Sequence, residues 1–141
     1  MQLLVSVADA PEARAALLGG ADVIDAKDPR GGALGAVRPE RLRTLRDAVG
    51  TGRPLSAALG DRGPPALVEC RAGAAAQVGA AFVKLGFRGA AAVSQARRRA
   101  AAARRGAACV GGRTGRVSRR RVAALSALAR VASLATAAAL V

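Results

Sequence analysis

Short apolar runs alternate with longer mixed stretches along the first part of the chain. Each run has five or six residues, the length of a buried strand, and is followed within two residues by Gly or Asp. The runs predict strands over Leu3–Val7, Asp22–Ala26, Leu55–Leu59 and Ala80–Leu85. Four strand–helix units with short connections are typical of a parallel sheet with right-handed crossovers, so the pattern predicts an α/β fold.

The intervening stretches carry helix start and stop signals. Asp9 is a good N-cap for a helix that continues through Ala13–Leu18. Pro39 opens a second helix, whose leucines recur at helical spacing and which ends near Gly50. A third helix is expected over about residues 66–78.

The pattern is less regular after the fourth strand. Ala90–Arg105 is rich in Ala and Arg and favours a helix. Gly106–Val110 is expected to form a fifth short strand, followed by the glycine-rich loop Gly111–Gly115. Ser118 is the expected N-cap of a last helix.

The composition excludes several kinds of site. The chain has no Trp or Tyr and two Phe, so its core must consist of Ala, Val and Leu. The absence of His excludes Ser-His-Asp catalysis and removes the commonest transition-metal ligand. Cys70 and Cys109 make no zinc site, and we expect them to be buried and reduced. We therefore expect neither a metal nor a cofactor.

Charge is unevenly distributed along the 141 residues. All nine acidic residues lie between Asp9 and Glu69, whereas residues 71–141 carry the whole net charge of +14. Such asymmetry indicates either an anionic partner or an arginine-rich genome combined with a missing acidic segment. For the arginine runs at 97–99, 104–105 and 119–121, a solvated helix face is favoured over phosphate contacts.

The chain lacks a run of 18 uncharged apolar residues, and its start lacks the basic region of a signal peptide. These features favour a cytoplasmic protein that does not associate with membranes.

Two lysines are the first candidates for chemistry. Of 23 cationic side chains, only Lys27 and Lys84 are lysine, and both stand at or near the end of a predicted strand. Arginine stays protonated, whereas a lysine can act as a neutral amine and form a Schiff base. Asp25 and Asp61 also lie at strand ends and are expected to support the lysines, although ordinary ion pairs would have the same pattern.

The loop that begins at Gly111, Gly112 and Arg113 is a candidate phosphate site. Backbone N–H groups of such a turn can bind an anion before a helix. The loop matches neither the P-loop nor the GxGxxG motif, and a plain connecting loop has the same composition.

Taken together, these segments resemble the (5-formylfuran-3-yl)methyl phosphate synthase family. The segments that carry the resemblance are LLVSV at 3–7, GGADVIDAKDPRGGALGA at 19–36, SAALGD at 56–61, FVKLGFRG at 82–89 and RGAACVGGRTGRVSRRRVAAL at 105–125. The resemblance implies a (β/α)₈ barrel that condenses two molecules of glyceraldehyde 3-phosphate, in the biosynthesis of methanofuran-type cofactors. It implies that Lys27 forms the Schiff base, that Lys84 moves protons, and that Gly111 and Gly112 hold a phosphate.

The length of the chain limits the barrel. A (β/α)₈ barrel needs at least about 200 residues, so we expect a single domain over 1–141 with about five units. The family's middle strands are expected to be missing around 90–105. An incomplete barrel has an open sheet edge, which a second copy of the chain could cover. The alternative functions are an inactive or partner-dependent half-barrel and a basic nucleic-acid-binding protein.

Overall fold

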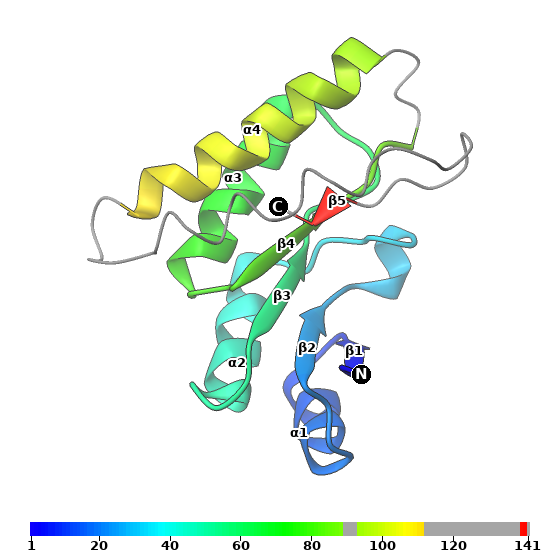
Figure 1. Ribbon diagram of the computed structural model, residues 1–141, viewed down its shortest axis with the longest axis vertical. Coiled ribbons are helices and arrows are strands. Elements are labelled where there is room, and N and C mark those ends of the chain that lie inside the picture. The colour runs from blue at the N-terminus through cyan, green and yellow to red at the C-terminus, as the bar shows by residue number, and fades with distance from the viewer. Residues whose placement is uncertain (89–92, 112–138, 141) are drawn as a thin grey trace.

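The computed structural model describes residues 1–88, 93–111 and 139–140 (Figure 1). The elements in chain order are β1 (Leu4–Val7), α1 (Ala10–Leu18), β2 (Val23–Ala26), the 3₁₀ turn η1 (Pro29–Gly31), α2 (Pro39–Val49), β3 (Leu55–Ala58), α3 (Pro65–Gln77), β4 (Phe82–Leu85), α4 (Val93–Gly111) and β5 (Ala139–Leu140).

One sheet joins all five strands in the order β1-β2-β3-β4-β5. The first four are parallel, and each is followed by a helix, so the predicted α/β fold with four βα units is confirmed. Strand β5 runs antiparallel to β4, with Lys84 opposite Leu140. The described residues therefore form one open sheet.

The two faces of the sheet differ in chemistry. The helix face packs against the helical layer and consists of Val5, Val7, Ile24, Ala26, Leu55, Ala57, Val83 and Leu85. Helix α1 contacts β1 and β2, and α2 contacts β2 and β3. Within the described ranges, the buried hydrophobic residues are Ala, Val, Leu and one Ile, which confirms the predicted core of small aliphatic residues.

The opposite face, here called the lysine face, carries the alternate residues Leu4, Ser6, Val23, Asp25, Lys27, Ser56, Ala58, Phe82 and Lys84. The register places Ser6 beside Asp25, and Asp25 beside Ser56. A row of polar side chains therefore crosses three adjacent strands just before their carboxyl ends, where parallel α/β proteins bind substrates.

The predicted strand at Gly106–Val110 is wrong, because α4 continues to Gly111. Alanine has the highest helix propensity, and a glycine inside a helix costs only about 1 kcal/mol. Gly106 is buried and lies against Glu69 and Ala72 of α3. Figure 1 shows α4 crossing this helix. Of the proposed phosphate loop, Gly111 is the last residue of α4, whereas Gly112 and Arg113 lie outside the described residues, as does the helix expected from Ser118.

The cysteines also differ from expectation. Cys70 on α3 and Cys109 on α4 are free but exposed, not buried. Both helices bury one narrow side, formed by residues such as Val68 and Ala72 on α3, and the cysteines lie away from it. None of the helices in the described ranges is long and apolar enough to cross a membrane.

The crossing of α3 and α4 generates a paired prediction. A Cβ atom at Gly106 would collide with the carbonyl oxygen of Glu69 and lie 3.0 Å from the Cβ of Ala72, whereas one at Gly73 would meet only the Gly106 oxygen at 3.5 Å. Gly106→Ala should therefore lower the free energy of unfolding by about 1–3 kcal/mol. Gly73→Ala, the matched control, should raise it by about 0.5–1 kcal/mol through helix propensity. Urea unfolding of both variants measures the difference, and a stabilising Gly106→Ala would contradict the close crossing.

Candidate functional site

Both lysines lie on the lysine face at the carboxyl edge of the sheet. Lys27 follows β2 directly, and the alternation of side chains places it on the same face as Asp25. Lys84 is the register partner of Ala58, which lies on this face by the same alternation. The lysines therefore flank the small side chain of Ala58, with Cα atoms about 10 Å apart, two strand spacings.

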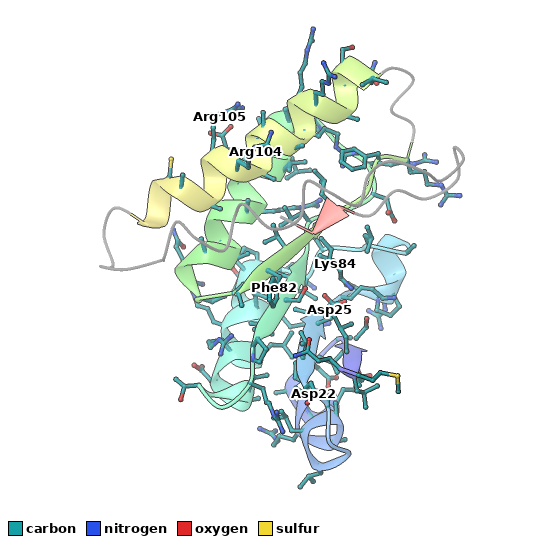
Figure 2. All side chains as sticks on the ribbon, in the orientation of Figure 1. Asp22, Asp25, Phe82, Lys84, Arg104 and Arg105 are labelled. Atoms are coloured by element: carbon teal, nitrogen blue, oxygen red, sulfur yellow. The ribbon has the colours of Figure 1, made fainter. Side chains whose placement is uncertain are left out.

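Asp25 is the buried centre of this site. Its side chain is fully buried, and its Oδ2 lies 2.5 Å from Lys84 Nζ (Figure 2). The same oxygen accepts a hydrogen bond of 2.9 Å from Ser6 Oγ. A buried carboxylate loses several kcal/mol of hydration, which these two partners offset. Asp25 thus joins β1, β2 and β4 through one oxygen atom.

Two buried oxygen atoms beside this pair lack hydrogen-bond partners within the described part of the chain. They are Asp25 Oδ1 and Ser56 Oγ, on neighbouring strands and in register with each other. Unpartnered buried polar groups are rare and recur at functional sites. The polar row is therefore not fully satisfied by the described residues alone.

Lys27 has a different environment from Lys84. Its side chain is half-buried, and its ammonium has neither an ion pair nor a hydrogen bond with any residue that the structure describes. Its backbone N–H donates to the Val7 carbonyl at 3.0 Å, which fixes its position at the strand end. Of the two amines, Lys27 can therefore act as a nucleophile without breaking an ion pair.

The other strand-end carboxylates bind backbone. Asp28 Oδ1 accepts from the Arg30 N–H at 3.0 Å and caps the η1 turn. Asp61 Oδ2 accepts from the Leu34 N–H at 2.9 Å, which holds the loop after Lys27 against the end of β3. Both therefore shape the edge of the site through loops, without a direct contact to either amine.

Two arginines near this edge were not predicted from the sequence to belong to the site. Arg99 on α4 is buried, and Arg71 on α3 donates to the Leu59 carbonyl at 2.9 Å. Burial lowers the pKa of Arg99, while the nearby Asp61 carboxylate raises it and Arg71 lowers it further. A solvated face is confirmed for Arg97 and Arg98, which are exposed, but it is wrong for Arg99.

A sequence signal for Arg99 existed. Ala102, Ala103 and Gly106 follow it at helical spacings of three, four and seven, and all four residues are buried. The run of three arginines hides this pattern of buried small residues, because every arginine in such a run is expected to lie on a solvated helix face.

The described ranges contain no group of three or more His, Cys, Asp or Glu side chains that could hold a metal ion. The functional groups on the lysine face include two amines, a buried carboxylate and two hydroxyl groups.

Comparison with known protein families decides the relationship. The model of the 4-HFC-P synthase family matches residues 3–104, which include Asp25, Lys27, Lys84 and Arg99. The chain belongs to the 4-HFC-P synthase family.

Individual proteins with this activity in their names are also similar to the chain. It is 44% identical over 90 residues to the (5-formylfuran-3-yl)methyl phosphate synthase of Methanococcus maripaludis, and 41% identical over 88 residues to that of Methanosarcina acetivorans. A putative (5-formylfuran-3-yl)methyl phosphate synthase of Methylorubrum extorquens is 43% identical over 89 residues.

These alignments cover 62–63% of the chain but only 37–38% of each relative. The chain thus matches well under half of the length of these 4-HFC-P synthase relatives. The segment matched by the family model, residues 3–104, includes both lysines.

Two aspartates in different environments test the buried pair. Asp25→Asn removes the charge that Lys84 binds, so it should lower the free energy of unfolding by about 3 kcal/mol. The control is Asp22→Asn, at a residue labelled in Figure 2. Asp22 makes an exposed pair with Arg53 at 3.5 Å, and an amide oxygen at this position can still accept the hydrogen bond from the Leu3 N–H. That change should cost less than about 1 kcal/mol. Chemical denaturation measures both, and equal losses would contradict a buried Asp25–Lys84 pair.

Proposed function

We propose that the chain carries the Schiff-base half of a (5-formylfuran-3-yl)methyl phosphate synthase site. In this reaction two molecules of glyceraldehyde 3-phosphate give the furan aldehyde phosphate, one phosphate and two waters. The observation that carries the proposal is the unequal pairing of the lysines: Lys84 binds buried Asp25, whereas Lys27 has no such partner within the described residues.

Lys27 is the proposed nucleophile. Its neutral amine adds to the carbonyl carbon of a triose phosphate, and the carbinolamine loses water to give an imine. The imine withdraws electrons from the neighbouring carbon, whose proton can then be removed to form the carbon–carbon bond. The half-buried position of Lys27 beside the small Ala58 leaves the amine accessible to such a substrate.

Lys84 is the proposed proton carrier. Its Nζ lies 2.5 Å from Asp25, so the pair holds protons at a fixed place on the same face as Lys27. Protons must leave carbon and reach departing oxygen atoms during the condensation and the dehydrations. Asp25 supports Lys84 directly, and Asp61 supports the site through the loop at Leu34.

The proposed phosphate site is the glycine-rich segment identified in the sequence. Gly111, Gly112 and Arg113 are the proposed phosphate-binding residues, and a phosphorylated triose is the proposed small-molecule partner. Neither a metal nor a cofactor is needed for the imine chemistry proposed here.

A partner-dependent half-barrel is the second candidate. We propose that the four βα units are a segment of a (β/α)₈ barrel, since the matched relatives are much longer than the matched segment. Strand β1 has no neighbour on its outer side among the described residues, and Leu3 and Leu4 near this edge are 50% and 41% exposed. A second copy of the chain is the proposed occupant of that edge.

Nucleic-acid binding has less support. Of the arginines on α4, Arg99 binds backbone carbonyls and Arg105 pairs with Glu69 at 2.9 Å. Figure 2 shows Arg104 and Arg105 on α4, well separated from Asp25 and Lys84. Binding of RNA or DNA would therefore use a surface distinct from the lysine site.

Borohydride trapping tests the imine. Reduction in the presence of glyceraldehyde 3-phosphate should add one triose phosphate to Lys27, which blocks tryptic cleavage after that residue. Lys27→Arg should abolish the adduct. Lys84→Arg should keep Lys27 as the trapped residue while lowering turnover by about 10²–10⁴. An adduct on Lys84 in the wild-type protein, or none at all, would overturn the assignment.

Light scattering on a dilution series tests whether a second copy of the chain binds the exposed sheet edge. We expect a dimer whose dissociation upon dilution is accompanied by loss of turnover, because the site is completed by the second copy. Leu4→Arg, at the exposed edge, should weaken the dimer, whereas Leu18→Arg at an exposed helix end should not. A fully active monomer would contradict the half-barrel model.

A further inference from the structure

One guanidinium group joins helix α4 to the end of strand β3. Arg99 is only 5% exposed, and its Nη1 donates to the Asp61 carbonyl at 2.8 Å. Its Nη2 donates to the Gly60 carbonyl at 3.3 Å. A buried guanidinium is costly unless its donors are used. Both terminal nitrogens of Arg99 are used in this way, whereas its buried Nε has no hydrogen-bond partner among the described residues.

The backbone at this point is shaped to receive arginines. Gly60 has a φ of +107°, a conformation that favours glycine. A Cβ there would lie 2.5 Å from Arg71 Nη1, the atom that donates to the Leu59 carbonyl. Arginines from α3 and α4 thus bind three successive carbonyl groups where β3 ends.

The same short segment contacts the residues that follow both lysines. The Gly60 carbonyl also accepts from the Gly86 N–H at 3.1 Å, two residues after Lys84. Asp61 packs so closely on Gly86 that a Cβ there would lie 2.8 Å from the Asp61 Cα. Its carboxylate accepts from the Leu34 N–H, in the loop that follows Lys27.

We propose that Arg99 is a positioning residue of the lysine site: by holding the Gly60–Asp61 backbone, it fixes the loops after β2 and β4, and so the relative placement of Lys27 and Lys84. This role rests on the proposed function. Arg99 acts from the outer helical layer and touches neither amine.

Helix docking alone does not require an arginine here. Ala102, Ala103 and Gly106 already bury the same side of α4 against its neighbours. An apolar side chain at position 99 would extend this contact without the desolvation cost of a guanidinium. What an arginine adds is two directed hydrogen bonds to one peptide segment, which set orientation as well as proximity.

Substitutions at position 99 test the proposal in the full chain. Arg99→Ala removes both hydrogen bonds, Arg99→Lys keeps the charge but not the fork, and Arg98→Ala changes an exposed neighbour as the matched control. Amide hydrogen exchange at Leu34 and Gly86 measures loop placement without any substrate. Steady-state kinetics and the rate of imine trapping at Lys27 measure the consequence for the site.

We expect Arg99→Ala to speed exchange at both amides by about tenfold or more, while the amides of α1 stay unchanged. The kcat should fall by about tenfold or more with KM changed less than about threefold, because geometry and not affinity is lost. Arg99→Lys should give intermediate values, and Arg98→Ala should match the wild type.

Each outcome separates this proposal from the proposed function. Unchanged exchange in a folded Arg99→Ala, or unchanged kcat in an active protein, overturns the positioning role. If the wild type forms no imine, the proposed function fails, and the exchange rates alone decide whether Arg99 positions the loops. If Arg99→Ala does not fold, Arg99→Lys is compared with the control, and wild-type exchange and kcat in that variant contradict the proposal.

Discussion

The ion pair between buried Asp25 and Lys84 is the interaction on which the rest of the site depends. It spans from β2 to β4, so both side chains pass over β3, where Ser56 and Ala58 are small enough to leave room. Removing a carboxylate from water costs several kcal/mol, and the pair with Lys84 and the hydrogen bond from Ser6 offset that loss. The pair engages one lysine and leaves Lys27 as the amine without a partner among the described residues.

The outer layer serves the same edge of the sheet. Small residues let α4 approach α3 closely, and this approach carries Arg99 to the carbonyls at the end of β3. From there Asp61 reaches the loops that follow β2 and β4. The lysine face and the helical layer are thus connected through a few backbone groups. The residues that form this connection lie within the segment that the family model matches, residues 3–104.

Much of the fold and the central residues could be predicted from the sequence, because strand length and turn chemistry are local properties. The four parallel strands and the caps at Asp9 and Gly50 follow from such local signals. The end of α4 was not predicted, because the glycine at position 106 indicates a break in the helix, whereas it permits the close approach of α3, a tertiary contact. Which lysine is paired depends on the strand register, which no local pattern contains. The burial of Arg99 did have a local signal, its helical spacing from Ala102, Ala103 and Gly106, but the run of arginines hid it.

The most direct test of the unequal lysines is competitive labelling with trace acetic anhydride, because the chain contains only these two lysines. The account predicts that Lys27 is acetylated at least about tenfold faster than Lys84, since Lys84 is held in an ion pair. In Asp25→Asn the two rates should converge as Lys84 is released. Equal rates in the folded wild-type protein, or faster labelling of Lys84, would contradict the account.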